Sequence, residues 1–415
     1  MPEPQRDDDS FGATHREWLV ERLTRYLGVP VDENVPFHEY GLDSVAALSL
    51  YGDIEEEFGP LIDPSDIAEH PTVRGLGRHM AQRDPHPAGG GLVRAAFVFT
   101  GQGSQHPGMT SGLYLDSTGF RTHLDEAAQA LLPYTGTSVV DLILKDDPRI
   151  HQTAFTQPAL FAVEYALAQV LQEAGVVPVA VLGHGIGEFA AATVAGALSL
   201  PDAARLVSMR GAFMQYLPSR GGMMATCAAP FEAAELVADE PGVGIGAINA
   251  AKATVLSGDR AGLERIQEIL ERRGISCRHL AVTHPFHSPL MAPMVPKFDS
   301  VARRVSGGAA RMPFYSTVHG RLTTEPLYGP YWSRQITAPV RFADAARAML
   351  AQQTPTHVVE IGPRVVLTPF LRRMGGSRGP RCLAVCRGPE SDAVDLAGVI
   401  SALDAGPLTA APAGA

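Results

Sequence analysis

The stretch Val179-Ala180-Val181-Leu182-Gly183-His184-Gly185-Ile186-Gly187-Glu188-Phe189 lies near the middle of this 415-residue chain. A short apolar run reaches three glycines and then continues, from Ala190 to Leu200, as small residues at helical spacing. This pattern predicts a buried strand, a sharp turn and a helix. Units of this kind build α/β folds, so the stretch determines the fold class that we expect.

The glycines of this turn match the frame G-x-S-x-G, in which a serine on the turn projects its hydroxyl above the sheet. That hydroxyl would lie at the positive end of the following helix. In this chain the central position is Gly185. Because glycine has no reactive atom, the sequence predicts the frame of a nucleophile site without its nucleophile.

The composition is that of an ordinary globular protein, with 45% apolar and 19% charged residues. The chain length favours two or three domains. No apolar run approaches the ~18 residues of a membrane span, and residues 1–9 are acidic rather than signal-like. We therefore expect a cytoplasmic protein without a membrane partner. We also expect no metal site, because the spacing of the cysteines matches no common zinc pattern (Cys227, Cys277, Cys382 and Cys386).

Charge is distributed unevenly along the chain. Residues 1–83 contain 7 Lys+Arg and 17 Asp+Glu, a net charge of −10, and the remaining residues are neutral overall. An acidic N-terminal module disfavours nucleic acid as a partner and favours docking onto basic patches of other proteins.

Residues 15–27, 44–57, 64–69 and 72–81 show the apolar spacing of short helices. Asp43 or Ser44 would cap the second helix, which buries Val45, Leu48 and Ile54 and exposes its acidic residues. A serine here is commonly no more than a cap. Yet Gly-Leu-Asp-Ser-Val over 41–45, followed by Leu48, resembles the acyl carrier proteins of polyketide synthases. The resemblance implies 4′-phosphopantetheine on Ser44 and docking through the acidic second helix.

A strand is also predicted at Ala95–Phe99, running into the glycine-rich turn Thr100–Gln105. The carboxyl ends of strands in α/β sheets are where such proteins place their sites. No acidic residue follows at the spacing that a ribose would require, so we reject a dinucleotide-binding fold. Residues 217–281 show a β-α-β-β-α-β rhythm typical of a ferredoxin-like unit.

Five features occur in order: the Gln102 turn, the Gly183–Gly187 turn, Arg210, the segment 284–287 and the strand 357–363. Together they resemble the malonyl/acyl-CoA acyltransferases of fatty acid and polyketide synthases. The resemblance covers about 94–386 and implies an α/β-hydrolase-like core. It also implies transfer of an acyl group from a CoA thioester, through a serine ester, to the thiol of an acyl carrier protein.

The same resemblance assigns roles in the site. It makes His287 the general base, with the main-chain carbonyl of Gln335 accepting from its other ring nitrogen. It makes the main-chain N–H groups of Gln102 and Ile186 the oxyanion hole. Gly185 stands where the family has its serine nucleophile.

Substrate choice follows from the same comparison. Arg210 matches the arginine that binds the free carboxylate of malonyl-type substrates, for which a planar guanidinium is better suited than lysine. His284 and Phe286 before His287 resemble the malonyl-type form, whereas Pro285 departs from the usual alanine and leaves another extender group open.

The sequence thus predicts an α/β protein with a four-helix carrier bundle at 15–83 and a linker at 84–93. An acyltransferase at 94–386, with a ferredoxin-like subdomain at 217–281, precedes a tail at 387–415. Acyl-CoA and other polyketide synthase proteins are the expected partners.

Three hypotheses accommodate Gly185: a deliberately silenced acyltransferase, a natural domain that binds acyl groups or carriers without turnover, and direct activation of the pantetheine thiol by His287. The alternative to an enzyme is therefore a catalytically silent docking module.

Overall fold

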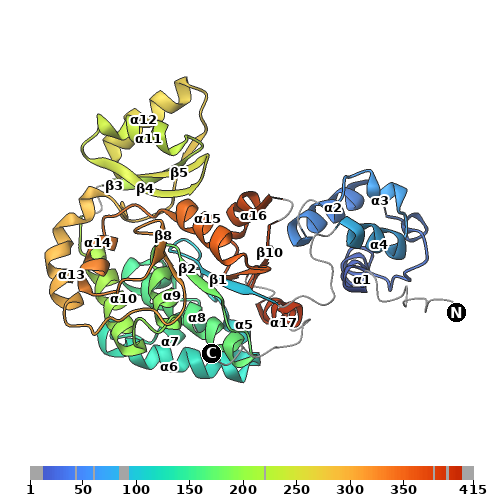
Figure 1. Ribbon diagram of the computed structural model, residues 1–415, viewed down its shortest axis with the longest axis horizontal. Coiled ribbons are helices and arrows are strands. Elements are labelled where there is room, and N and C mark those ends of the chain that lie inside the picture. The colour runs from blue at the N-terminus through green and yellow to red at the C-terminus, as the bar shows by residue number, and fades with distance from the viewer. Residues whose placement is uncertain are drawn as a thin grey trace, which may run out of the picture. The chain divides into compact units, whose positions relative to one another are not determined.

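Figure 1 shows the computed structural model, which describes residues 13–42, 44–58, 61–83, 93–218, 221–376, 379–388 and 392–403. The expectations for residues 1–12, Asp43, most of the 84–93 linker and the end of the tail lie outside these residues. The chain divides into two compact units. One comprises Arg94–Met374 with Leu383–Leu403, and the other comprises the N-terminal residues to Val93 with Gly375–Cys382 and the C-terminal end.

The N-terminal unit is helical. Its elements are α1 (Ala13–Leu27), η1 (Phe37–Tyr40), α2 (Ser44–Phe58), α3 (Asp66–Glu69) and α4 (Val73–Arg83). Apolar side chains spaced three or four apart on these helices form its core, as the helical pattern predicts: Leu19, Leu23, Leu50, Ile54, Leu76 and Met80. The helix α2 begins at Ser44, the position that the capping pattern indicated. The side chains of Ser44, Val45 and Leu48 are not among those described.

The larger unit is built on a six-stranded sheet in the order β10-β9-β1-β2-β7-β8. Its strands are β1 (Ala95–Phe99), β2 (Ala180–Gly183), β7 (Phe314–Ser316), β8 (Arg321–Thr323), β9 (His357–Ile361) and β10 (Arg381–Ala384). The central strands β9, β1, β2 and β7 are parallel, and β8 is antiparallel to β7. Every residue of β1 and β2 is buried, which explains their unbroken apolar runs.

Helices pack on this sheet and on one another, and α8 contacts both α6 and α10. The remaining elements of this layer are α5 (Ser111–Asp116), α6 (Thr118–Thr135), α7 (Val139–Leu144), η2 (Pro148–His151), α8 (Thr153–Glu173), α9 (Gly187–Val194), α10 (Leu200–Gln215), η3 (Pro289–Met294), α13 (Val295–Ala302), α14 (Gly329–Gln335), α15 (Phe342–Gln353), α16 (Thr368–Gly375) and α17 (Asp392–Leu403).

A second, antiparallel sheet forms the lobe at the top left of Figure 1, with two helices on its outer face. Its elements in chain order are β3 (Gly221–Thr226), α11 (Pro230–Ala238), β4 (Val243–Ala250), β5 (Ala253–Asp259), α12 (Arg260–Arg272) and β6 (Cys277–His279), and its sheet order is β4-β5-β3-β6. The element order is β-α-β-β-α-β. Main-chain hydrogen bonds between Val340 and both Gly246 and Ile248 join this lobe to the segment before α15.

Candidate active site

The turn between β2 and α9 requires glycine at its two outer positions. A Cβ on Gly183 would lie 2.3 Å from the main-chain nitrogen of Glu188, and a Cβ on Gly187 would lie 2.1 Å from the carbonyl oxygen of Thr100. Gly185 differs, because a Cβ there would meet only His287 Nε2, at 3.4 Å. Its φ of +57° is a left-handed conformation that side chains adopt at some cost. Position 185 therefore has room for a side chain, and that side chain would touch the imidazole.

His287 is held in one tautomer. Its Nδ1 lies 2.9 Å from the main-chain carbonyl of Ala338, and since a carbonyl can only accept, Nδ1 carries the proton. The lone pair is then on Nε2, the atom that faces position 185. The sequence pointed to the carbonyl of Gln335 as this acceptor. The structure gives the role first to Ala338, and the carbonyl of Gln335 makes a weaker backbone contact.

Burial lowers the pKa of His287 to about 3, and the neighbouring charges of Arg210 and His184 act in the same direction. The two backbone carbonyls oppose this shift only in part. The imidazole is therefore neutral throughout the physiological pH range, with Nε2 free to accept a proton.

The side chain of Gln335 supports the turn from below. Its Nε2 donates to the carbonyl of Gly185, at 2.6 Å, and to Glu188 Oε2, at 3.2 Å. Glu188 is fully buried, and its Oε1 accepts from the main-chain N–H of Thr317, at 2.7 Å, and from the hydroxyl of Tyr331, at 2.9 Å. Sequence reasoning gave Glu188 no role. The available indication in the sequence was its position in the first turn of the helix after the glycines, where the helix dipole favours a carboxylate.

Among the described residues, no carboxylate forms a hydrogen-bonded ion pair with the buried guanidinium of Arg210, on α10. Arg210 is 2% exposed, and its Nε has no hydrogen-bond partner among the described residues. The guanidinium carbon lies 6.0 Å from the ring centroid of Phe189, the residue after Glu188. Burial lowers the pKa of Arg210 to about 9 and the charge of Glu188 opposes this, so the guanidinium stays charged at neutral pH. A buried charge without a partner is costly, so this one is suited to an anionic ligand.

The turn after β1 packs onto the turn after β2. A Cβ on Gly101 would lie 2.8 Å from the carbonyl oxygen of His184, so the two backbones touch. The side chain of Gln102 is fixed by Thr153 and Gln157. Within the described part of the chain, the main-chain N–H groups of Gln102 and Ile186 have no recorded acceptor. Two free donors thus flank the turn that carries Gly185.

His284 and Phe286 line the segment that leads to His287. His284 is 2% exposed and both of its ring nitrogens are engaged, Nδ1 with Thr283 Oγ1 at 2.9 Å and Nε2 with the carbonyl of Leu217 at 3.0 Å. Phe286 is buried, and its carbonyl accepts from Ser257 Oγ at 2.6 Å. Both residues fasten the His287 segment to neighbouring elements, and neither His284 nitrogen is free for proton transfer.

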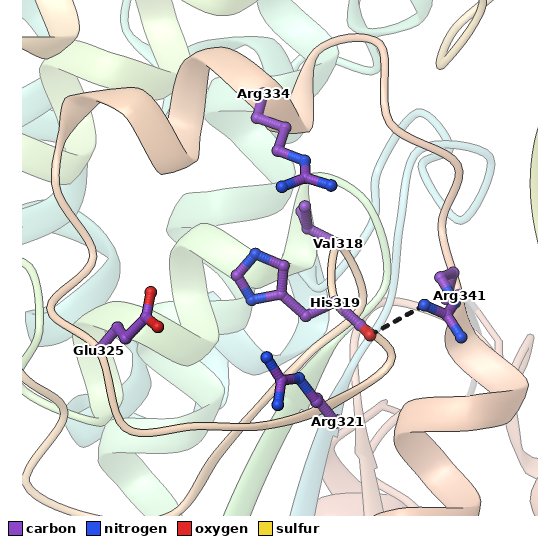
Figure 2. Close-up of a pocket in the computed structure, with 6 residues that line it drawn as sticks. All are labelled: Val318, His319, Arg321, Glu325, Arg334 and Arg341. Carbon is purple, nitrogen blue, oxygen red and sulfur yellow. Dashed lines mark hydrogen bonds between the residues drawn. The ribbon is translucent and has the colours of Figure 1, made fainter.

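A concavity with a volume of about 400 Å³ opens beyond β7 and β8. Its lining consists of Val318, His319, Arg321, Glu325, Arg334 and Arg341. Figure 2 shows Arg321 and Arg334 on opposite sides of the His319 ring, while Arg341 donates to the His319 carbonyl at 3.1 Å. None of the site residues predicted from the sequence lines it, so it is separate from the site around Gly185.

Comparison with known proteins identifies the class. Residues 96–390 match the family described as acyl transferase domain, and residues 17–80 match the phosphopantetheine attachment site. Since the first match covers well over half of the chain, the chain belongs to the acyl transferase domain family.

The similar proteins include polyketide synthases and an acyl carrier protein transacylase. The chain is 38% identical over 321 residues to polyketide synthase GfsB of Streptomyces halstedii, a match that covers 76% of this chain but 6% of that protein. It also resembles the solved acyltransferase domain from the second module of the salinomycin polyketide synthase (TM-score 0.71, 37% identity, 74% and 73% of the two chains). A malonyl-CoA:acyl carrier protein transacylase of Xanthomonas oryzae pv. oryzae is similar as well (TM-score 0.67, 29% identity, 75% and 98%).

No helix of the described residues has the length and apolar character to cross a membrane. No group of three or more His, Cys, Asp or Glu side chains in the same residues is placed to hold a metal ion.

Proposed function

We propose that this chain is a carrier protein fused to a polyketide-type acyltransferase, which loads a malonyl-type group from CoA onto a 4′-phosphopantetheine thiol. In this proposal the carrier is the four-helix bundle of residues 15–83, with the arm on Ser44. The acyltransferase of residues 94–386 combines an α/β-hydrolase-like core with the ferredoxin-like subdomain at 217–281. The observation that carries the proposal is the open position at Gly185, directly before His287 Nε2.

Gly185 stands in the nucleophile's place, so no acyl ester forms on the chain as it is. A thiol with an ordinary pKa near 8.5 needs far less activation than a hydroxyl, and the pantetheine arm brings one. His287 Nε2 takes the thiol proton, and the sulfur attacks the carbonyl carbon of the acyl-CoA thioester. The tetrahedral oxyanion collapses and expels the CoA sulfur, which takes the proton back from His287.

Three groups support this step. The free N–H groups of Gln102 and Ile186 are available to the oxyanion. The buried guanidinium of Arg210 pairs with the malonyl carboxylate. Because the charge of Arg210 lowers the pKa of His287, a bound carboxylate offsets that effect and raises the pKa of His287 toward the range of a useful base. A substrate with a free carboxylate therefore improves the base that acts on it.

One observation favours a second function. Glycine has no reactive atom and costs the turn nothing, so the domain keeps its shape without the family's chemistry. A silent domain that binds acyl groups or carriers, and docks onto other synthase proteins, fits this as well. Which extender is accepted also stays a proposal, because Pro285 departs from the malonyl-type segment.

The test is the intact mass of the pantetheinylated chain after incubation with malonyl-CoA, beside Gly185→Ser and Ser44→Ala. If the glycine chain gains a malonyl group on its arm and Ser44→Ala does not, direct thiol attack is supported. His287→Asn in the same series should then abolish the gain. If only Gly185→Ser loads, the chain is a silenced acyltransferase or a binding domain, and direct transfer is wrong.

A further inference from the structure

A carboxylic acid is buried beneath the turn that carries Gln102. Glu164, on α8, is fully buried beside the end of β1, and its Oε1 lies 2.7 Å from Thr100 Oγ1. Its Oε2 has no hydrogen-bond partner among the described residues. Burial raises the pKa of Glu164 well above its usual range, and donation from Thr100 to the ionised form would oppose this only in part.

The hydroxyl contacts around Glu164 have a forced direction. Ser104 Oγ lies 2.9 Å from the carbonyl oxygen of Gly101, which can only accept, so the single hydroxyl proton of Ser104 is used there. Thr100 Oγ1 lies 3.1 Å from Ser104 Oγ, so Thr100 must donate in that contact. The proton of Thr100 is then also used. With both hydroxyl protons used in this way, the contact between Thr100 Oγ1 and Glu164 Oε1 is completed by a proton on Glu164; the ionised acid would instead accept from Thr100.

We infer that Glu164 is a positioning residue, held as a neutral carboxylic acid that donates to Thr100. This relay of hydrogen bonds runs from Glu164 through Thr100 and Ser104. It ends on the carbonyl of Gly101, the residue directly before Gln102. It therefore fixes the N–H of Gln102 that the proposed reaction uses for the oxyanion. The inference rests on the proposed function only for this kinetic consequence.

The surroundings leave the relay little freedom. Thr100 is wedged between two glycines, because a Cβ on Gly362 would lie 2.1 Å from its Oγ1 and a Cβ on Gly187 would lie 2.1 Å from its carbonyl oxygen. Thr100 and Ser104 are both fully buried. Thr100 thus contacts the ends of β1 and β9 and the first turn of α9. Because Thr100 cannot move away, loss of the Glu164 proton displaces the turn that carries Gln102.

Ionisation of Glu164 removes one hydrogen bond from the relay. An ionised Glu164 accepts from Thr100, so Ser104 faces two acceptors, Thr100 Oγ1 and the Gly101 carbonyl, with one proton. One contact then fails and the turn loosens. Since the folded pKa is raised, the stability from the neutral acid is complete below the ordinary pKa of a glutamate and is lost as pH rises through the folded pKa.

Glu164→Gln tests this without any activity. The amide is isosteric with the acid and donates to Thr100 at every pH, so its urea midpoint should rise relative to the unsubstituted chain between pH 5 and 8. Glu268→Gln, at an exposed position on α12, is the matched control and should run parallel to the unsubstituted chain. The infrared band of a protonated carboxyl at pH 7 should weaken in Glu164→Gln only. Parallel midpoints, or an unchanged band, would overturn the neutral acid.

The positioning role is tested in the Gly185→Ser background by malonyl transfer. Ser104→Ala removes the last link and leaves the acid in place, so kcat should fall roughly tenfold or more with KM within about twofold. Glu164→Gln should keep kcat within about threefold, and Glu164→Ala should lose as much as Ser104→Ala. Equal rates in all variants would refute positioning. If the Gly185→Ser chain itself transfers no malonyl group, the proposed function fails. The urea midpoints at different pH values still test whether Glu164 is a neutral acid.

Discussion

Two places at the carboxyl ends of neighbouring parallel strands combine histidine with arginine, and they differ in burial. Around Gly185, His287 and Arg210 are 8% and 2% exposed. In the concavity beyond β7, His319 is only half-buried and Arg334 is exposed (Figure 2). The pKa of both histidines is lowered, first by burial and then by arginines, but only that of His287 falls to about 3. The same residue types therefore carry different pKa values where water is excluded and where it is not.

The largest difference is expected for the two arginines. In the chain as it is, Arg210→Gln should weaken malonyl-CoA binding roughly 100-fold to 1,000-fold, because a desolvated carboxylate loses its charged partner. Acetyl-CoA has no carboxylate, so its binding should change little. Arg334→Gln is the matched substitution in the exposed concavity and should leave both affinities within about twofold. Calorimetry measures the affinities of both variants for both CoA thioesters. Equal losses of malonyl-CoA affinity in the two variants would show that burial of the arginine does not decide binding.

The glycine turn offers the next comparison. Gly183→Ala places a Cβ against main-chain atoms that cannot move away, so we expect a loss of about 3 kcal/mol in the free energy of unfolding. Gly185→Ala adds only left-handed strain, about 1 kcal/mol. Urea unfolding measures both. A Gly185→Ala chain as unstable as Gly183→Ala would contradict the open position in front of His287.

A smaller effect separates the two histidines by pH. The folded pKa of His287 lies below its unfolded value, so the stability it contributes is complete above about pH 6.5 and is lost as pH falls toward 3. Replacing it by Asn, which tolerates its φ of +58°, should reduce the loss of stability between pH 7 and pH 5 by about 2 kcal/mol. His319→Asn should reduce that loss by less. Urea midpoints at pH 7 and pH 5 measure these losses of stability. An equal reduction in the two variants would refute the difference between the two histidines.

Much of the fold could be predicted from the sequence because the decisive signals are local. Apolar runs marked β1, β2 and β9, and the β-α-β-β-α-β rhythm of the small lobe matches its observed element order. The start of α8 is a boundary that local propensity does not give. Proline favours the first turn of a helix, yet α8 begins at Thr153 and carries Pro158 inside. The earlier turn is stabilised by packing, as Thr153 and Thr156 are fully buried, and packing is not visible in local propensity.

Gly185, Arg210 and His287 were singled out because they fall in motifs that resemble one family, and their roles stay predictions. The structure does bring them together, since position 185 faces His287 Nε2 and the charge of Arg210 acts on His287. The residues that sequence reasoning missed act through distant contacts. Ala338 orients His287 with a main-chain carbonyl, which every residue possesses. Glu164 lies 64 positions from Thr100 in the chain.

The sequence by itself determined the strand, turn and helix around Gly185, the absence of a reactive atom there and the acidity of residues 1–83, since these follow from the residues present. The tertiary structure decided which imidazole nitrogen faces position 185, which carbonyl orients it and which arginine lost its water. Tautomer, pKa and desolvation depend on neighbours brought together from separate segments. Spacing along the chain encodes local geometry, whereas reactivity is set by what surrounds each group in space.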